Sequence, residues 1–253
     1  MTLRSLLALA LVAGPLAGQR ATVDTIRVAG QPLAVHRYAP AGPPRCPAVL
    51  LLSGDGGWAL GVVQWAEALR ADGLEVVGVD AARLVKVVGA AGLAGLVAGW
   101  PELARLTRTP PVVIGYSRGA TIGLVLASRA ASPPPVVLLG VDLEDHFDGP
   151  AVPGGLAPGV RRHGDYVVDL RPLFVDRART TAVAVIHGKR DRVAPYDSLR
   201  PWLDSLPEPK HVTILPRSGH GFGDSRTVLP AIRESLGWVA GEVCREIRPA
   251  RSP

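Results

Sequence analysis

Residues 111–120 read PVVIGYSRGA, and this segment decides the fold. A run of β-type apolar residues leads directly into the pattern G-x-S-x-G, and small residues with helical character follow it. Strand, sharp turn and helix in this order are what a nucleophile elbow requires, whereas the pentapeptide alone is a weak signal. The segment therefore predicts an exposed, reactive Ser117 between a buried strand and a helix.

Ser117 is expected in a strained turn, because Gly115 and Gly119 on either side carry no Cβ atoms that would clash there. The N-terminus of the following helix would direct its dipole at negative charge developing beside the serine. An ordinary Gly-rich strand–helix turn is the alternative interpretation.

Apolar strand-like segments alternate with helix-like segments through most of the chain. Apolar residues have helical spacing just after residue 60 and in residues 90–106, 121–130 and 228–243. Between these segments lie continuous apolar runs, which are typical of parallel strands. Two further β-patterned runs at the N-terminus suggest a hairpin on an antiparallel edge. We expect an α/β fold with a mostly parallel sheet covered by helices on both faces. The expected strands are 22–28, 32–38, 47–52, 74–79, 111–114, 136–139, 182–186 and 211–215.

The alternation is interrupted at residues 142–179, which are rich in Gly, Pro, Asp and Arg. We interpret this stretch as a lid or insertion over the carboxyl edge of the sheet. One domain over residues 19–248 is expected, followed by a loose tail at 249–253.

A serine hydroxyl needs a base, and His220 is the best of six histidines. It lies in Ser-Gly-His-Gly-Phe just after the last expected strand, where small neighbours let a loop carry the ring over the sheet edge. The other five are more easily structural or surface residues: His36, His146, His163, His187 and His211.

Asp191 is the expected acid, in a loop that leaves the strand at 182–186. An acid there would fix the tautomer of the histidine and stabilise its charged form. Asp142 and Asp224 are rivals, and a solvated loop carboxylate is the plain alternative. The order Ser117, Asp191, His220 is the chain order of α/β-hydrolases.

An oxyanion hole needs two backbone N–H groups. Arg118, the residue after the nucleophile, would supply one, and the Gly-rich loop at residues 53–58 would supply the other. Asp55 is the first choice in that loop and Gly56 the alternative. Trp58 and Tyr116 are expected to contact the substrate. No phosphate-loop pattern follows the strand, and no metal or organic cofactor is implied.

The N-terminus predicts export. Residues 1–18 read MTLRSLLALALVAGPLAG, with Arg4 before an apolar run too short to span a bilayer and small residues after it, as in a signal peptide. A buried N-terminal helix is the alternative. In an oxidising compartment Cys46 and Cys244 could pair, or both could be buried thiols.

The net charge is +6, with 25 Arg against 3 Lys. Coding bias explains this excess, and an anionic partner such as a phospholipid surface is the functional alternative. No basic block or basic-aromatic stripe indicates nucleic acid binding.

Three motifs together resemble the VirJ/AcvB branch of bacterial α/β-hydrolases: LLSGDGGW at 51–58, GVD at 78–80 and GYSRGA at 115–120. The resemblance covers about residues 47–130, and the C-terminal half departs from it. It implies a periplasmic protein and, for AcvB-type members, hydrolysis of aminoacyl-phosphatidylglycerol. Asp55 could then pair with a substrate ammonium, and Arg118, Arg161 or Arg162 with a phosphate.

These observations predict an exported serine esterase with Ser117, His220 and Asp191 as its catalytic residues. A small-ester esterase, a thioesterase or a peptidase could use the same residues, because specificity lies in the shape of the pocket. A non-catalytic binding or secretion-associated protein on the same fold is the alternative of a different class, since fold does not settle function. The sequence does not determine the oligomeric state.

Overall fold

The computed structural model describes residues 21–40, 42–147, 160–162, 165–169 and 181–247. The expected signal peptide at 1–18, the expected tail at 249–253 and most of the expected lid lie outside these residues. The side chains of Arg161 and Arg162 lie outside them as well.

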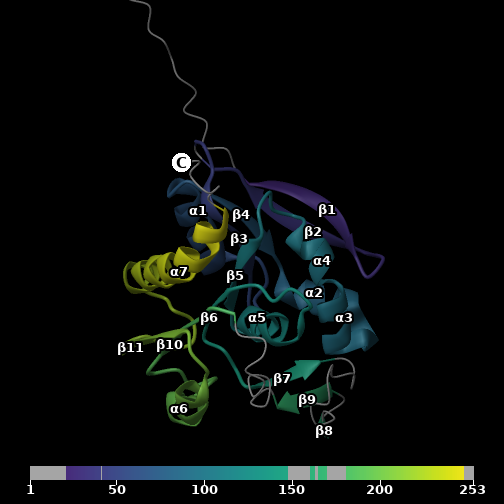
Figure 1. Cartoon of the computed structure of the whole chain (residues 1–253). Helices are drawn as coiled ribbons and strands as arrows, with labels where there is room; N and C mark the ends of the chain where they lie inside the picture. The colour runs from purple at the N-terminus through teal and green to yellow at the C-terminus, as the bar shows by residue number, and fades with distance from the viewer. Residues whose placement is uncertain (1–20, 41, 148–159, 163–164, 170–180, 248–253) are drawn as a thin grey trace, which may run out of the picture.

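A central sheet of eight strands organises the described part of the chain (Figure 1). The strands follow the order β1-β2-β4-β3-β5-β6-β10-β11 across the sheet. β2 pairs antiparallel with β1 and β4, and the other pairs are parallel, which confirms the antiparallel edge and the parallel sheet predicted from the sequence. The bounds are Thr22–Val28 (β1), Gln31–Tyr38 (β2), Arg45–Leu52 (β3), Leu74–Val79 (β4), Pro111–Tyr116 (β5), Val136–Leu139 (β6), Val183–Gly188 (β10) and Lys210–Leu215 (β11).

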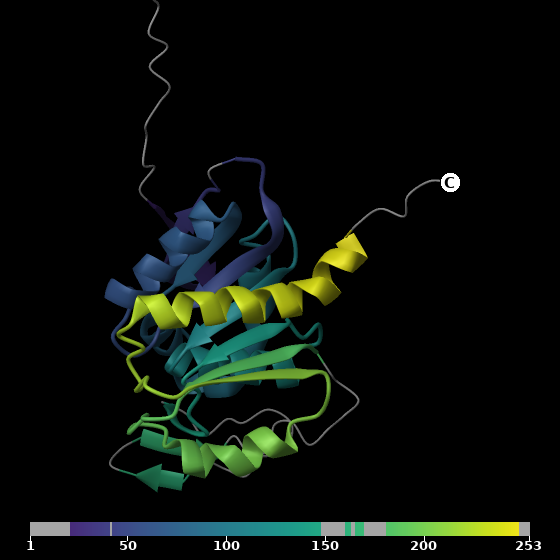
Figure 2. The same cartoon turned by 90° about the vertical axis from the view of Figure 1, so that its left-hand side faces the viewer.

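Helices cover both faces of this sheet. α1 and α7 pack on one face, and α2, α3 and α5 on the other; Figure 2 shows α7 crossing in front of the strands. The helices are Leu60–Ala71 (α1), Ala81–Val88 (α2), Gly92–Ala98 (α3), Trp100–Ala104 (α4), Arg118–Arg129 (α5), Tyr196–Ser205 (α6) and Ser225–Ile247 (α7), with a short 3-10 turn at Gly89–Ala91.

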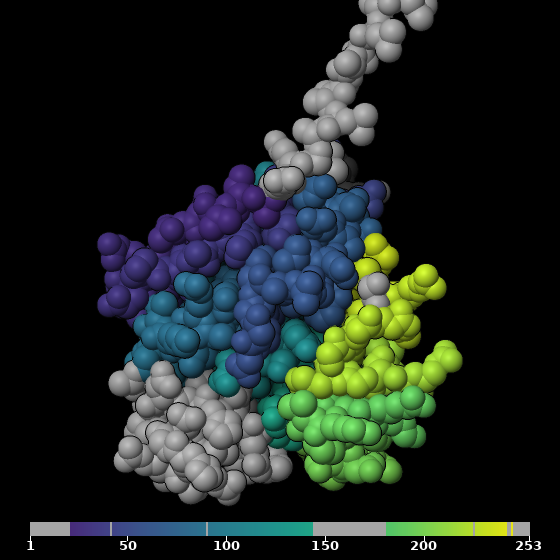
Figure 3. All heavy atoms as spheres, turned by 180° about the vertical axis from the view of Figure 1, so that it is seen from behind, coloured from purple at the N-terminus to yellow at the C-terminus, as the bar shows by residue number. Residues whose placement is uncertain are grey.

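The central strands are apolar on both sides because both sides are buried. In β3, Val49 and Leu51 pack towards α1 and α7, whereas Leu50 and Leu52 pack towards α2 and α5. β1 at the edge of the sheet is largely exposed. The reverse face in Figure 3 places the N-terminal hairpin and the C-terminal segments at opposite ends of the molecule, as the strand order requires.

The helical stretch predicted over residues 90–106 is not one continuous helix. The structure divides this stretch into the end of a 3-10 turn, α3 and α4. Gly89 and Gly92 have positive φ values of 52° and 50°, which interrupt a regular helix, and a new helix begins at Trp100, with Pro101 in its first turn. α6 was not predicted at all.

The region of the expected lid contains a small antiparallel sheet. Its described strands are Glu144–Phe147 (β7), Val160–Arg162 (β8) and Asp165–Asp169 (β9), in the order β7-β9-β8. The function of this region as a lid stays a prediction.

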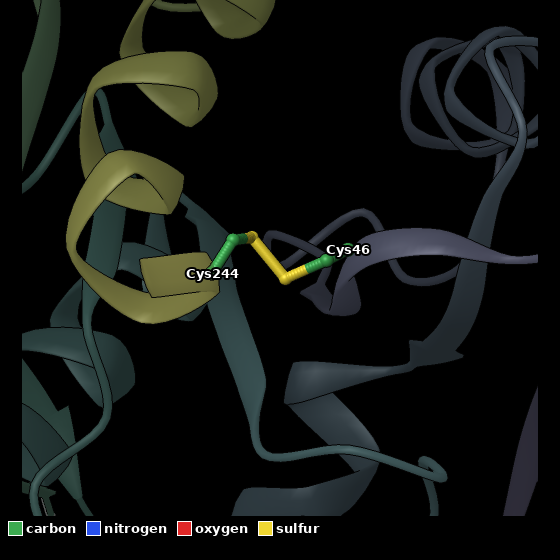
Figure 4. The surroundings of a disulfide bond; sticks show 2 residues. All are labelled: Cys46 and Cys244. Carbon is green, nitrogen blue, oxygen red and sulfur yellow. A yellow bond between two sulfur atoms is a disulfide. The ribbon is translucent and has the colours of Figure 1, made fainter. Parts of the chain in front are cut away.

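Cys46 and Cys244 form a disulfide (Figure 4). It joins the start of β3 to the C-terminal part of α7, across 198 residues of sequence. Of the two alternatives left open by the sequence, the paired one is the one observed.

Within the described ranges, no single helix has both the length and the apolar character needed to cross a membrane. α2 and α3 meet this test only when taken as a pair, and the chain bends by 104° between them.

Candidate active site

Ser117 lies in a strained turn between β5 and α5. Its φ and ψ are 52° and −118°, a conformation that L-residues rarely adopt. A Cβ atom on Gly115 would lie 2.2 Å from the carbonyl oxygen of Gly119, and one on Gly119 would lie 2.4 Å from the carbonyl oxygen of Leu52. Both glycines are therefore required by close backbone approach, as predicted for a nucleophile elbow.

Three side chains that are far apart in the sequence form one hydrogen-bonded chain. Nε2 of His220 lies 2.9 Å from Oγ of Ser117, and Nδ1 of His220 lies 2.7 Å from Oδ2 of Asp191. These distances match the geometry of a nucleophile, its base and an orienting acid. The structure thus brings together the three residues selected from the sequence.

Asp191 is held by the loop that carries it. Its side chain is fully buried, and Oδ1 accepts hydrogen bonds from the backbone N–H groups of Val193 at 2.8 Å and Ala194 at 2.9 Å. The other oxygen, Oδ2, is directed at His220. Two backbone donors on one oxygen restrict the orientation of the carboxylate.

The loop that carries His220 is fixed by packing beneath the ring. Phe222 has a φ of 44° and is buried, with its ring centroid 6.0 Å from that of Tyr116. Gly140 lies close to His220: a Cβ atom there would be 3.4 Å from Nδ1 of the imidazole. The backbone N–H of Arg190 also donates to the carbonyl of Ser218, which ties the acid loop to the histidine loop.

The Gly-rich loop after β3 packs directly against the elbow. A Cβ atom on Gly54 would lie 3.0 Å from the ring of Tyr116 and 3.2 Å from Cβ of Ser117. Buried Ser53 accepts a hydrogen bond from the N–H of Ala81 through Oγ, which anchors the loop to the start of α2. Asp55, which follows Gly54, lies beside Arg118.

Asp55 and Arg118 form an ion pair. Nε of Arg118 contacts Oδ1 of Asp55, and Nη2 lies 3.3 Å from Oδ2. The side chain of Arg118 is only 15% exposed, whereas that of Asp55 is 63% exposed. Asp55 had been expected to pair with a substrate ammonium and Arg118 with a phosphate. In this structure the two side chains are paired with each other instead.

Trp58 and Tyr116 lie in different surroundings. The indole of Trp58 covers Gly78, where a Cβ atom would be 2.1 Å away, donates to Oη of Tyr38 at 3.2 Å and stacks on His36. These contacts anchor the Gly-rich loop to the sheet. Tyr116 lies beneath His220, with ring centroids 5.8 Å apart, and burial raises the pKa of its phenol, with a further contribution from Asp191. Substrate contact by either residue stays a prediction.

For one of the two rival acids, Asp142, the backbone carbonyl accepts a hydrogen bond from Oγ1 of Thr121. The other, Asp224, binds Oγ1 of Thr227 at the start of α7. That hydrogen bond, followed by one from the N–H of Arg226, lowers the pKa of Asp224. Among the rival histidines, His211 stacks on Trp238. His146 and His163 have side chains outside the described residues.

Sequence reasoning missed the position of His187. This fully buried residue lies next to Asp191, with Nε2 2.9 Å from the carbonyl oxygen of Ala194 and 3.7 Å from Oδ2 of Asp191. Burial lowers the pKa of its imidazole, against smaller opposing effects from Ala194 and Asp191. The only feature of the sequence that could have indicated this role is that a histidine lies at the end of the strand before Asp191.

No group of three or more His, Cys, Asp or Glu side chains suited to a metal ion occurs within the described ranges.

Residues 47–131 match the family model described as bacterial virulence protein (VirJ). No curated protein sequence matches the chain. Among solved structures, it is similar to an esterase domain from Rhodothermus marinus, with 17% identity and a TM-score of 0.64 over 87% of this chain and 98% of the other. It is also similar to a putative dienelactone hydrolase from Klebsiella pneumoniae, with 15% identity and a TM-score of 0.63 over 87% of this chain and 98% of the other. A third similar structure is a membrane phospholipase A described as a bacterial virulence factor, with 14% identity and a TM-score of 0.58 over 87% of this chain and 86% of the other.

These likenesses agree with the strand order and the elbow. The chain has an α/β-hydrolase fold, and its residues 47–131 are VirJ-like, as the sequence motifs predicted. The three VirJ-like motifs also meet in space, since Gly54 packs on the elbow and Trp58 covers Gly78.

Proposed function

We propose that this protein is a serine hydrolase that cleaves an ester through an acyl-enzyme intermediate. The observation that carries the proposal is the hydrogen-bonded chain from Ser117 through His220 to Asp191, with distances of 2.9 and 2.7 Å. A scaffold protein has no need for this arrangement, in which a half-buried serine lies in a strained turn and is paired with a base.

In the proposed reaction, Oγ of Ser117 attacks the ester carbonyl carbon while Nε2 of His220 takes the hydroxyl proton. The tetrahedral intermediate collapses when the carbon–oxygen bond to the leaving alcohol breaks, and the proton on Nε2 passes to that alcohol. A water molecule then attacks the acyl group by the same route and regenerates Ser117. Asp191 stays ionised and stabilises the imidazolium in both steps.

The negative oxygen of the intermediate would be bound by the backbone N–H groups of Arg118 and Asp55, with Gly56 as the alternative to Asp55. Arg118 begins α5, where the helix dipole favours negative charge. The loop after β3 is close enough to contribute, because Gly54 lies against Ser117. No described residue accepts a hydrogen bond from the N–H of Asp55 or Gly56.

The VirJ-like segment supports aminoacyl-phosphatidylglycerol as the substrate, and the likeness to a phospholipase supports a lipid ester more generally. Small esters are the competing substrate class, supported by the likeness to esterases. If an aminoacyl lipid binds, its ammonium group must either compete with Arg118 for Asp55 or find another partner, because the two side chains are paired. Contact with an anionic membrane surface is part of the lipid proposal.

Export to the periplasm or beyond the cell is part of the same proposal. The disulfide between Cys46 and Cys244 is the structural support, since disulfides persist in oxidising compartments. The sequence of residues 1–18 is the second support.

The test measures release of free amino acid from lysyl- and alanyl-phosphatidylglycerol, and hydrolysis of p-nitrophenyl acetate and butyrate, by purified residues 19–253. Ser117→Ala is the inactive variant. Ser205→Ala, an exposed serine on α6, is the matched control that keeps wild-type rates. Release from the lipids that depends on Ser117 supports the aminoacyl-lipid substrate. If only the small esters are hydrolysed, the protein is a small-ester esterase. If neither class of substrate is hydrolysed, the proposal is contradicted.

A further inference from the structure

We infer that the ion pair between Asp55 and Arg118 positions the two proposed oxyanion donors and cancels the carboxylate charge beside them. This inference rests on the proposed function, because it assigns a role to side chains of residues whose backbones would bind the oxyanion.

The pair joins the two segments that must meet to form an oxyanion hole. Asp55 belongs to the loop after β3, and Arg118 is the first residue of α5, 63 positions later in the sequence. The contact is made at two points, with Nε of Arg118 on Oδ1 and Nη2 on Oδ2 of the carboxylate. A two-point contact between guanidinium and carboxylate fixes their relative orientation as well as their distance.

The same two residues carry the proposed N–H donors. The segments are already in contact through glycines, because Gly54 lies against Ser117 and Gly119 lies against the carbonyls of Leu52 and Ser53. Glycines permit this approach but also leave the loop backbone more freedom than other residues would. The ion pair restricts that freedom on the outer side of the loop, where Asp55 is largely exposed.

The second effect is electrostatic. An unpaired carboxylate at Asp55 would repel the negative oxygen that forms in the transition state next to the same residue. The guanidinium of Arg118 neutralises it, and the low exposure of Arg118 limits screening by water. The two partners are therefore not equivalent: loss of Arg118 leaves a harmful negative charge, whereas loss of the Asp55 charge does not.

This asymmetry defines the experiment. Arg118→Gln, Asp55→Asn and the double variant are compared by steady-state kinetics on p-nitrophenyl butyrate at low and high NaCl. The matched control is Asp72→Asn, which breaks a two-point pair of Asp72 with Arg233 at 2.7 and 3.0 Å, outside the proposed site. Unfolding midpoints verify that each variant is folded.

We expect Arg118→Gln to lower kcat about tenfold and Asp55→Asn about threefold, both with KM within twofold of the wild type. The double variant should be no slower than Arg118→Gln, because the partners act as a unit. High salt should raise kcat of Arg118→Gln by screening Asp55, and should leave Asp55→Asn unchanged. Asp72→Asn should keep wild-type kcat and KM.

If the wild type hydrolyses the ester and both single variants have kcat values within twofold of the wild-type value, the proposed role of the ion pair is wrong. The proposed function then stays intact. Independent, multiplicative losses in the double variant overturn it as well. If Arg118→Gln does not fold, Asp55→Asn and its salt response decide the question. A wild-type protein without turnover overturns the proposed function together with this inference.

Discussion

The Nε2 atom of His187 lies 3.7 Å from Oδ2 of Asp191, inside the protein. Nε2 also lies 2.9 Å from the carbonyl oxygen of Ala194, so the ring donates its Nε2–H to that acceptor. The N–H of Ala194 in turn donates to Oδ1 of Asp191. His187 thus fixes the backbone that holds the acid, as a neutral ring that adds no charge to the site.

The buried His187 makes the protein sensitive to acid. Burial lowers the pKa of the folded imidazole below its usual 6.5, so the unfolded chain takes up this proton at a higher pH than the folded protein does. The stability that depends on the neutral ring is fully present above about pH 6.5 and is lost as the pH falls towards the folded pKa.

We therefore expect the free energy of unfolding to fall more steeply between pH 6.5 and 5 in the wild type than in His187→Gln. The difference in slope should approach but not exceed about 1.4 kcal/mol per pH unit. Glutamine keeps an amide donor for the Ala194 carbonyl but does not titrate. Urea unfolding at several pH values measures this, and equal slopes would contradict the assignment of His187.

Gly119→Ala should destabilise the protein, because the added methyl group would lie 2.4 and 2.5 Å from the backbone carbonyl oxygens of Leu52 and Ser53. Backbone cannot yield as a flexible side chain can, so we expect a loss of about 1–3 kcal/mol in the free energy of unfolding. Gly237→Ala is the matched control. Gly237 lies on α7, and a Cβ atom there meets nothing within 4 Å. Because alanine favours the helix more than glycine does, this change should raise the free energy of unfolding by up to about 1 kcal/mol. Similar urea midpoints for the two variants would exclude the close approach at Gly119.

The disulfide should contribute to stability without affecting turnover. It closes a loop across 198 residues, and the chain-entropy relation then predicts a loss of about 5 kcal/mol in the double variant Cys46→Ser, Cys244→Ser. The bond lies at the start of β3, whereas Ser117 follows the end of the parallel strand β5, at the opposite edge of the sheet. Turnover at 25 °C should stay within about twofold of the wild type. A large fall in kcat with the fold intact would mean that the disulfide and the site are coupled.

The strands beneath the site were predictable because each is a continuous apolar run, and β4 and β6 have the bounds expected from the sequence. Ser117 and His220 could be selected because each lies in a short motif at the end of a strand. The breaks within the helical stretch predicted over residues 90–106 were missed because its apolar spacing continues through the glycines at which the helices end and begin. α6 was missed because only Leu199, Trp202 and Leu203 mark its buried face, and Pro201 lies inside it.

Two features of the site could not be predicted from residue patterns. His187 acts on Asp191 through the backbone of Ala194, and a contact to a main-chain carbonyl leaves no mark in the side chains of a sequence. The ion pair of Asp55 with Arg118 requires two loops to meet in space. Each side chain read by itself suggested a free charge for a substrate, and only the structure pairs them.

The central claim is that Ser117 is a nucleophile activated by His220. Its most direct measurement is the mass of the intact protein, and of its peptides, after reaction with a fluorophosphonate probe, because this requires no knowledge of the natural substrate. We expect one probe adduct on the wild type, located at Ser117, and none on Ser117→Ala. His220→Gln should react at least about a hundredfold more slowly, since the hydroxyl then lacks its base. A wild-type protein that takes up no probe, or takes it up equally when Ser117 is replaced, would contradict the account.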